Sequence, residues 1–122
     1  MKNHSLLESF ICAFLGIAKT IKKERNFKIQ ICAAICALGI AIFLKVSAIE
    51  FISILISISM VLTAELINTA IEATVDLFTG DKYHQLAKAA KDAAAGAVLI
   101  TSVNAVAVGG AVFFKGLLNV FF

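Results

Sequence analysis

The feature that most restricts this chain is a run of 22 residues, 93–114, that contains no charged side chain. A membrane helix needs roughly 20 apolar residues to cross a hydrocarbon core of about 30 Å, so this run is long enough to span a bilayer by itself. Two more uncharged runs, 29–44 and 51–64, precede it, and the second continues as a helical pattern to Phe78. The three runs predict three transmembrane helices, over about residues 27–47, 50–78 and 92–114.

The composition excludes a soluble fold. Of the 122 residues, 61% are hydrophobic and 16% are charged, whereas a soluble domain has about 45–50% apolar and about 25% charged residues. Such a chain has too few polar side chains to cover a soluble domain, and its apolar content also excludes a disordered chain. The length allows one domain, over residues 1–122. We therefore expect a single all-α integral membrane domain.

Residues 5–23, before the first predicted span, have a different pattern. Apolar residues recur there at helical spacing, at Phe10, Phe14, Ile17 and Ile21, and lysines gather at the end of the segment. This pattern is typical of an amphipathic helix that lies in the plane of the membrane interface. An alternative is that the helix packs on the bundle and does not contact lipid.

The basic residues are unevenly distributed along the chain. Six of the eleven precede residue 29 and three lie in the 79–92 loop, whereas the 45–50 connection and the C-terminal tail carry one each. The positive-inside rule therefore predicts that the N-terminus and the 79–92 loop are cytoplasmic. No aromatic platform or recognition motif accompanies the basic cluster, so we expect no nucleic-acid partner.

The three cysteines form no CxxC pair. Cys32 and Cys36 share a helix face inside an apolar run, and we interpret them as small core residues. Cys12 lies in the predicted surface helix.

One face of the second predicted span is polar at its cytoplasmic end. Glu65, Asn68, Glu72 and Asp76 are spaced so that they fall within about 80° around a helix. If the core is entered at Phe51 and crossed in about 20 residues, Glu65 lies about 9 Å inside the cytoplasmic boundary. An ionisable side chain near the membrane centre costs at least about 2.5–3.5 kcal/mol, so this set is a functional candidate.

A simpler interpretation is that these charges only set the depth of the helices. That interpretation accounts for Asp76, Asp81 and Lys88, which lie near the loop. It explains poorly a carboxylate at the depth of Glu65 that shares its face with an amide and a second carboxylate. We therefore favour a functional site.

Charged residues next to the other two spans reach the same boundary: Glu24 before the first, and Lys91 and Asp92 before the third. Carboxylates from two helices, Glu24 and Glu72, suit magnesium, which prefers oxygen ligands, and a lysine suits phosphate oxygens. A half-buried glutamate such as Glu65 suits the acceptance of a proton from an alcohol. The set predicts phosphoryl transfer to a lipid hydroxyl, although neither a P-loop nor a kinase glycine-rich loop is present.

A non-enzymatic membrane oligomer or channel is the alternative from another class. An acidic stripe that faces a bundle axis can line a pore. A pore predicts polar residues along a whole helix face. In the second predicted span, residues 51–64 offer only serines and a threonine as polar side chains, and all the carboxylates after Glu50 lie at the cytoplasmic end. The pattern favours an interfacial site over a pore.

The stretch 65–76, ELINTAIEATVD, resembles the signature of the prokaryotic diacylglycerol kinase and undecaprenol kinase family. The segments 23–27 (KERNF), 83–84 (YH) and 90–98 (AKDAAAGAV) match the other landmarks of that family in order and spacing, so the resemblance covers about residues 9–114. The resemblance implies a bacterial inner-membrane enzyme that uses MgATP to phosphorylate a lipid alcohol. It also implies a homotrimer with N-terminal surface helices and active sites shared between subunits.

The resemblance also implies roles for individual residues. Glu65 matches the general base, and Glu24 and Glu72 match the metal ligands. Asn68 and Asp76 match polar active-site positions. The positions that match nucleotide contacts are Glu24, Glu72, Lys82, Tyr83, His84, Lys91 and Asp92.

Two positions depart from the well-studied diacylglycerol kinases. Ser5 or a neighbour stands where those proteins carry an N-terminal arginine, and Gln30 stands where they carry an acidic residue. The run KDAAAGAV, together with Glu24-Arg25-Asn26, looks more like the undecaprenol kinase branch. We therefore expect undecaprenol as the acceptor, with diacylglycerol as the alternative.

Overall fold

The computed structural model describes residues 5–122, and this part of the chain forms four helices and no strand. Three of the helices are long and apolar enough to cross a membrane, which confirms the prediction of an all-α chain with three candidate spans. The helices are α1 (Leu6–Lys23), α2 (Arg25–Phe43), α3 (Ala48–Thr79) and α4 (Gln85–Phe121).

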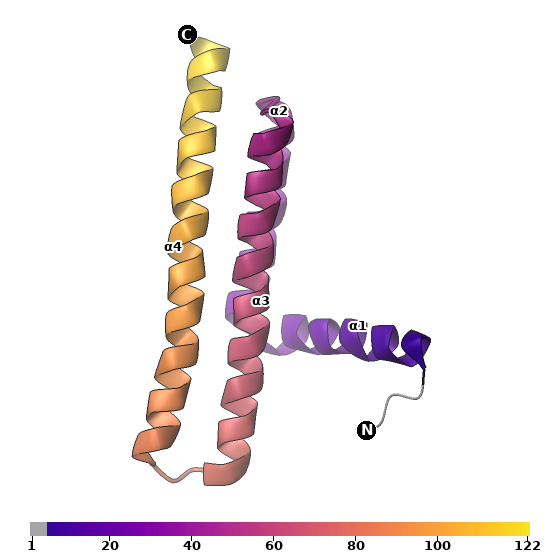
Figure 1. Cartoon of the computed structure of the whole chain (residues 1–122), viewed down its shortest axis with the longest axis vertical. Helices are drawn as coiled ribbons and strands as arrows, with labels where there is room; N and C mark the ends of the chain where they lie inside the picture. The colour runs from indigo at the N-terminus through magenta and orange to yellow at the C-terminus, as the bar shows by residue number, and fades with distance from the viewer. Residues whose placement is uncertain (1–4) are drawn as a thin grey trace.

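Helices α2, α3 and α4 run side by side, and α1 lies almost at right angles to them (Figure 1). The most extensive contact joins α3 to α4, whereas α2 packs mainly on α3. The 32 residues of α3 correspond to about 48 Å of helix, which exceeds a hydrocarbon core of about 30 Å. The ends of α3 and α4 that meet at their connecting loop therefore project beyond the level of α1 (Figure 1).

Local signals in the sequence set the helix boundaries. Ser47 and Glu50 form a reciprocal capping box that begins α3, with each side chain accepting the other's backbone N–H. Helix α3 ends at Gly80, whose φ of 58° lies in the left-handed region that glycine adopts without strain. His84 begins α4, because its Nδ1 accepts the backbone N–H of Leu86 at 3.2 Å.

The apolar core lies at the end of the bundle opposite the α3–α4 loop. Ala41, Ile54 and Val112, one from each long helix, form its buried centre. A hydrogen bond of 3.3 Å from Asn104 Nδ2 to Ser57 Oγ adds a polar link between α4 and α3. These contacts join the three long helices on the side of the bundle away from the α3–α4 loop.

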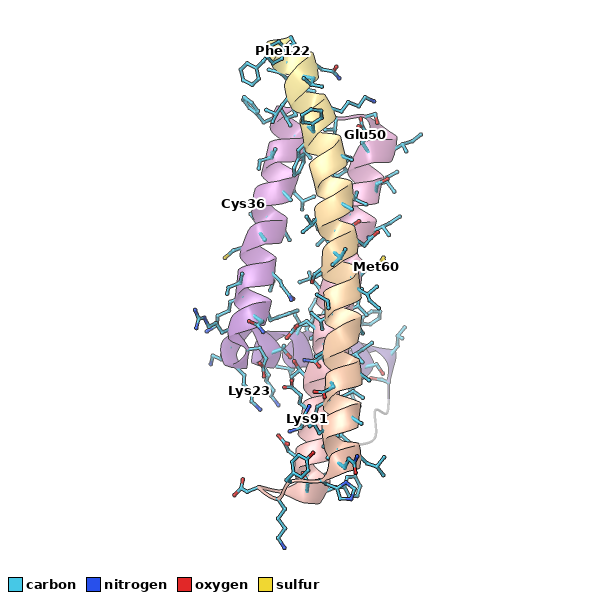
Figure 2. The ribbon with its side chains drawn as sticks, turned by 90° about the vertical axis from the view of Figure 1, so that its left-hand side faces the viewer. Lys23, Cys36, Glu50, Met60, Lys91 and Phe122 are labelled. Atoms are coloured by element: carbon cyan, nitrogen blue, oxygen red, sulfur yellow. The ribbon has the colours of Figure 1, made fainter. Side chains whose placement is uncertain are left out.

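The interpretation of Cys32 and Cys36 as core residues is wrong for the single chain, since both side chains are exposed. Helix α2 contacts α3 through the face that carries Ala41, and the cysteines lie about 140–180° around the helix from that residue. Figure 2 shows Cys36 pointing away from the other helices.

Candidate active site at the loop end of helix α3

Glu65 is the most deeply buried ionisable residue of the described chain, with only 3% of its surface exposed. Its Oε2 accepts a hydrogen bond of 3.3 Å from the side-chain amide of Gln30, which comes from α2. A buried carboxylate is costly unless hydrogen bonds compensate it, and one neutral donor compensates it only in part. The site therefore holds a carboxylate that has capacity to accept further hydrogen bonds.

Three buried side-chain atoms within residues 5–122 lack a hydrogen-bond partner. One belongs to the residue that contacts Glu65, and the other two belong to residues about one helical turn after Glu65 on α3. The three atoms are Gln30 Oε1, Asn68 Oδ1 and Thr69 Oγ1. An unsatisfied buried polar atom costs about 1–3 kcal/mol, so native proteins keep few of them without a functional reason. Around Glu65 the structure therefore leaves hydrogen-bonding capacity that a polar group of a ligand could use.

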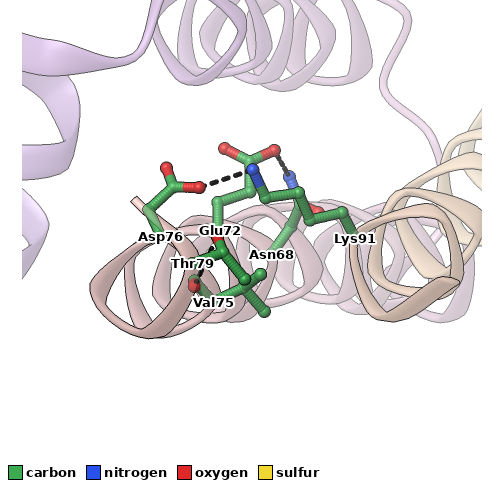
Figure 3. Close-up of polar contacts among 6 residues, drawn as sticks. All are labelled: Asn68, Glu72, Val75, Asp76, Thr79 and Lys91. Atoms are coloured by element: carbon green, nitrogen blue, oxygen red, sulfur yellow. Dashed lines mark hydrogen bonds and ion pairs between the residues drawn. The ribbon is translucent and has the colours of Figure 1, made fainter. Parts of the chain in front are cut away.

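Asn68 and Glu72 are paired one turn further along α3. The Nδ2 of Asn68, which is 8% exposed, donates to Glu72 Oε1 at 3.1 Å (Figure 3). This bond orients the half-buried carboxylate of Glu72 and leaves Asn68 Oδ1 without a partner beside it. The sequence placed both residues on one helix face, and the structure brings their side chains together.

Asp76 binds a residue from the next helix. Its Oδ1 lies 2.5 Å from the Nζ of Lys91 on α4, and this ion pair crosses from α3 to α4 near their loop (Figure 3). Asp92 is instead paired with Lys88, one turn earlier on α4. Lys91 therefore lies next to the carboxylates of α3, whereas Asp92 faces another part of the helix surface.

The remaining predicted site residues lie at the edges of this region. Glu24 has an extended backbone, connects α1 to α2 and is partly exposed. Lys82, Tyr83 and His84 are exposed in the α3–α4 loop, where the imidazole caps α4. Residues 5–122 of one chain contain no group of three or more metal-ligating side chains.

An elongated apolar cavity of about 460 Å³ lies between α2, α3 and α4. It reaches from Gln30 to Phe113 and is lined mostly by small and aliphatic side chains. Gln30 therefore both lines this cavity and contacts Glu65. Its volume and apolar lining suit part of a hydrocarbon chain.

The contact between Gln30 and Glu65 was not anticipated from the sequence. In the sequence, Gln30 stands out only as a departure from the diacylglycerol kinase pattern. The available signal was that it is the only residue with a long polar side chain in the uncharged run 29–44. A lone amide in a membrane span is costly and points to a specific partner.

Comparisons with known proteins identify the family of the chain. Residues 11–113 match the family model described as prokaryotic diacylglycerol kinase. The chain is 46% identical over 110 residues to the undecaprenol kinase of Bacillus subtilis, covering 90% of this chain and 89% of that protein. It is 40% identical over 115 residues to a diacylglycerol kinase of Synechocystis, covering 94% of this chain and 66% of the relative.

The Escherichia coli K12 diacylglycerol kinase is 40% identical over 91 residues, which cover 75% of this chain and 74% of that protein. The relatives are named kinases, so the channel hypothesis is set aside. With a family match that extends over most of the sequence, the chain belongs to the prokaryotic diacylglycerol kinase family and is a lipid kinase.

Proposed function

We propose that this protein transfers the γ-phosphoryl group of ATP to the hydroxyl of a membrane lipid alcohol, with undecaprenol as the acceptor. The observation that carries the proposal is the buried carboxylate of Glu65, with one amide donor and unpartnered polar atoms around it. This is the environment in which a carboxylate accepts a proton from an alcohol.

Glu65 would act as the general base. As the hydroxyl oxygen of the lipid bonds to the γ-phosphorus, its proton passes to a carboxylate oxygen of Glu65. The bond from that phosphorus to the β–γ bridging oxygen breaks, and ADP leaves with the electron pair. Phosphoryl transfer depends mainly on positioning and charge stabilisation, which is consistent with the few polar groups present here.

Lys91 would bind phosphate oxygens of the nucleotide. Its pairing with Asp76 holds the ammonium group beside α3, close in space to the pair of Asn68 and Glu72 (Figure 3). Asp92 and the loop residues Lys82, Tyr83 and His84 are proposed as further nucleotide contacts, as the family resemblance implies. Their exposure in the α3–α4 loop leaves them accessible to a nucleotide.

The donor atoms present fit magnesium, because they are carboxylate and amide oxygens. Glu72 and Glu24 would hold the ion, and the unpartnered Oδ1 of Asn68 adds a hard oxygen next to Glu72. When bound, magnesium would offset the negative charge of the phosphates.

We propose that Glu24 and Glu72 meet across a subunit boundary in a homotrimer. The resemblance implies shared sites, and the described part of one chain contains no complete cluster of metal ligands. Helix α1 would lie on the cytoplasmic surface of the inner membrane, with apolar side chains toward lipid. Phe10, Phe14 and Leu7 are exposed on it, and the bundle covers few of its residues.

The choice of undecaprenol is supported by the identity to the Bacillus subtilis undecaprenol kinase, which extends over nearly the full length of both chains. The apolar cavity that begins at Gln30 offers room for part of a prenyl chain next to Glu65. Diacylglycerol is the alternative acceptor, since the relatives from Synechocystis and Escherichia coli are named for it.

The test is transfer of labelled phosphate from ATP to undecaprenol and to diacylglycerol in mixed micelles that contain magnesium. We expect undecaprenol to be the better acceptor, and Glu65→Gln to lower turnover at least about 100-fold while nucleotide binding persists. Glu50→Gln, a second carboxylate of α3 at the opposite end, is the matched control and should stay near wild type. Product from neither lipid would refute the function, and an active Glu65→Gln variant would refute the assignment of the base.

A further inference from the structure

Gln30 and Glu65 form a contact between two helices that are remote in sequence. Gln30 belongs to α2 and Glu65 to α3, 35 positions later, and the amide Nε2 donates to Oε2 at 3.3 Å. Within residues 5–122, this is the only hydrogen bond or ion pair made by the side chain of Glu65, a residue that lies inside the regular backbone of α3. The position of the carboxylate therefore depends on a donor supplied by a different helix.

The side-chain amide of Gln30 is only partly hydrogen-bonded. The Oε1 of Gln30 is buried and has no partner, so this side chain satisfies only part of its hydrogen-bonding capacity. An apolar side chain of the same size would be less costly to bury in this otherwise apolar run. The bond to Glu65 is the compensation that the structure offers for burying this amide.

A glutamate side chain turns about three torsions, and a single donor from a neighbouring helix restricts all of them. Because Gln30 also lines the apolar cavity, its amide lies where the cavity and the carboxylate meet. Gln30 would therefore align two things: the hydrocarbon chain of a lipid in the cavity, and the Glu65 carboxylate that accepts the proton.

We propose that Gln30 is a positioning residue for Glu65, whose amide N–H holds the carboxylate in the orientation that receives the proton of the acceptor hydroxyl. This inference rests on the proposed function of Glu65. Gln30 itself exchanges no proton: the hydroxyl proton goes to a Glu65 oxygen as the hydroxyl oxygen bonds to phosphorus. Its contribution is geometric, and it therefore affects turnover more than binding of ATP.

The experiment compares two substitutions at position 30 by steady-state kinetics. Gln30→Met keeps the length of the side chain and removes the donor, and we expect it to lower kcat about 10- to 100-fold, as for loss of a hydrogen bond to a charged group. The KM for ATP should stay unchanged. Gln30→His places an N–H at nearly the same distance from the backbone and should restore most of kcat.

Asn104→Leu is the matched control. Like Gln30→Met, it removes an amide that donates across to α3, but its partner is Ser57, remote from Glu65. We expect this variant to keep a kcat near wild type. Size-exclusion chromatography and thermal unfolding in detergent confirm that each variant is folded.

Three results would overturn the positioning role: an unchanged kcat in Gln30→Met, an equal loss of kcat in Asn104→Leu, or no recovery in Gln30→His. Glu65→Gln, assayed in parallel, separates this inference from the proposed function. If Glu65→Gln is inactive while Gln30→Met is fully active, only the positioning role is refuted. If Glu65→Gln is active, the assignment of the base fails first.

Discussion

The ammonium nitrogen of Lys91 lies 2.5 Å from a carboxylate oxygen of Asp76, and this ion pair joins α4 to α3 next to the loop that connects them. Both side chains are partly exposed, so the pair contributes at most about 1 kcal/mol to stability. Its importance lies in where it holds a positive charge. Lys91 is kept beside the polar face of α3, where the phosphates of a nucleotide are proposed to bind.

Lys91→Met should therefore affect catalysis far more than stability. We expect kcat to fall at least about 100-fold, as for loss of one group that stabilises charge in a transition state. Lys115→Met is the matched control, because Lys115 also pairs across from α4 to α3, with Glu50 at the opposite end of the bundle. It should stay within about threefold of wild type, since an exposed pair contributes little. Equal losses in the two variants would contradict the role of Lys91.

Glu72→Gln should change the dependence of activity on magnesium. The substitution keeps the size of the side chain and removes the charge of a proposed ligand, so half-maximal activity should require at least about tenfold more magnesium. A magnesium titration at fixed ATP measures this shift. Asp81→Asn, which removes an exposed carboxylate from the α3–α4 loop, should leave the titration unchanged. A normal titration curve for Glu72→Gln would exclude it as a ligand.

Asn68→Leu should separate activity from stability. The variant loses the donor to Glu72 and also removes a buried oxygen that has no partner. Activity should fall at least about tenfold, whereas thermal stability should be unchanged or higher, because the cost of the unsatisfied atom disappears. Asn104→Leu should show the opposite pattern, with near-normal activity and a loss of about 0.6 kcal/mol. A strongly destabilised Asn68→Leu would argue for a structural role.

Gly116 marks a close approach between α4 and Leu44, the residue that follows α2. A Cβ atom at Gly116 would lie 3.0 Å from Leu44 Cδ1, and Leu44 is itself buried at 7% exposure, so it has little room to move. We expect Gly116→Ala to destabilise the protein by about 1–3 kcal/mol through overpacking. At Gly110 a Cβ would meet nothing within 4 Å, and Gly110→Ala should stabilise by up to about 1 kcal/mol. Thermal unfolding in detergent tests both, and equal midpoints would refute the close packing.

Much of the fold could be predicted because its causes are local. The uncharged runs predict membrane helices, since an unpaired backbone polar group is too costly in lipid for any other spanning element of this length. Helical periodicity also placed Glu65, Asn68 and Glu72 on one face of α3. The pairing of Asn68 with Glu72 follows from that periodicity, because residues four apart on a helix are neighbours.

What only the tertiary structure decided are the contacts between helices. The hydrophobic pattern predicts that α2 has an apolar surface. Because that surface is apolar on all sides, the pattern does not indicate which face of α2 packs against α3. This is why Cys32 and Cys36 were assigned to the core and are exposed. It is also why the partner of Glu65 was not anticipated: the rotation of α2 that brings Gln30 to Glu65 is set by packing along the whole helix, which no local spacing encodes.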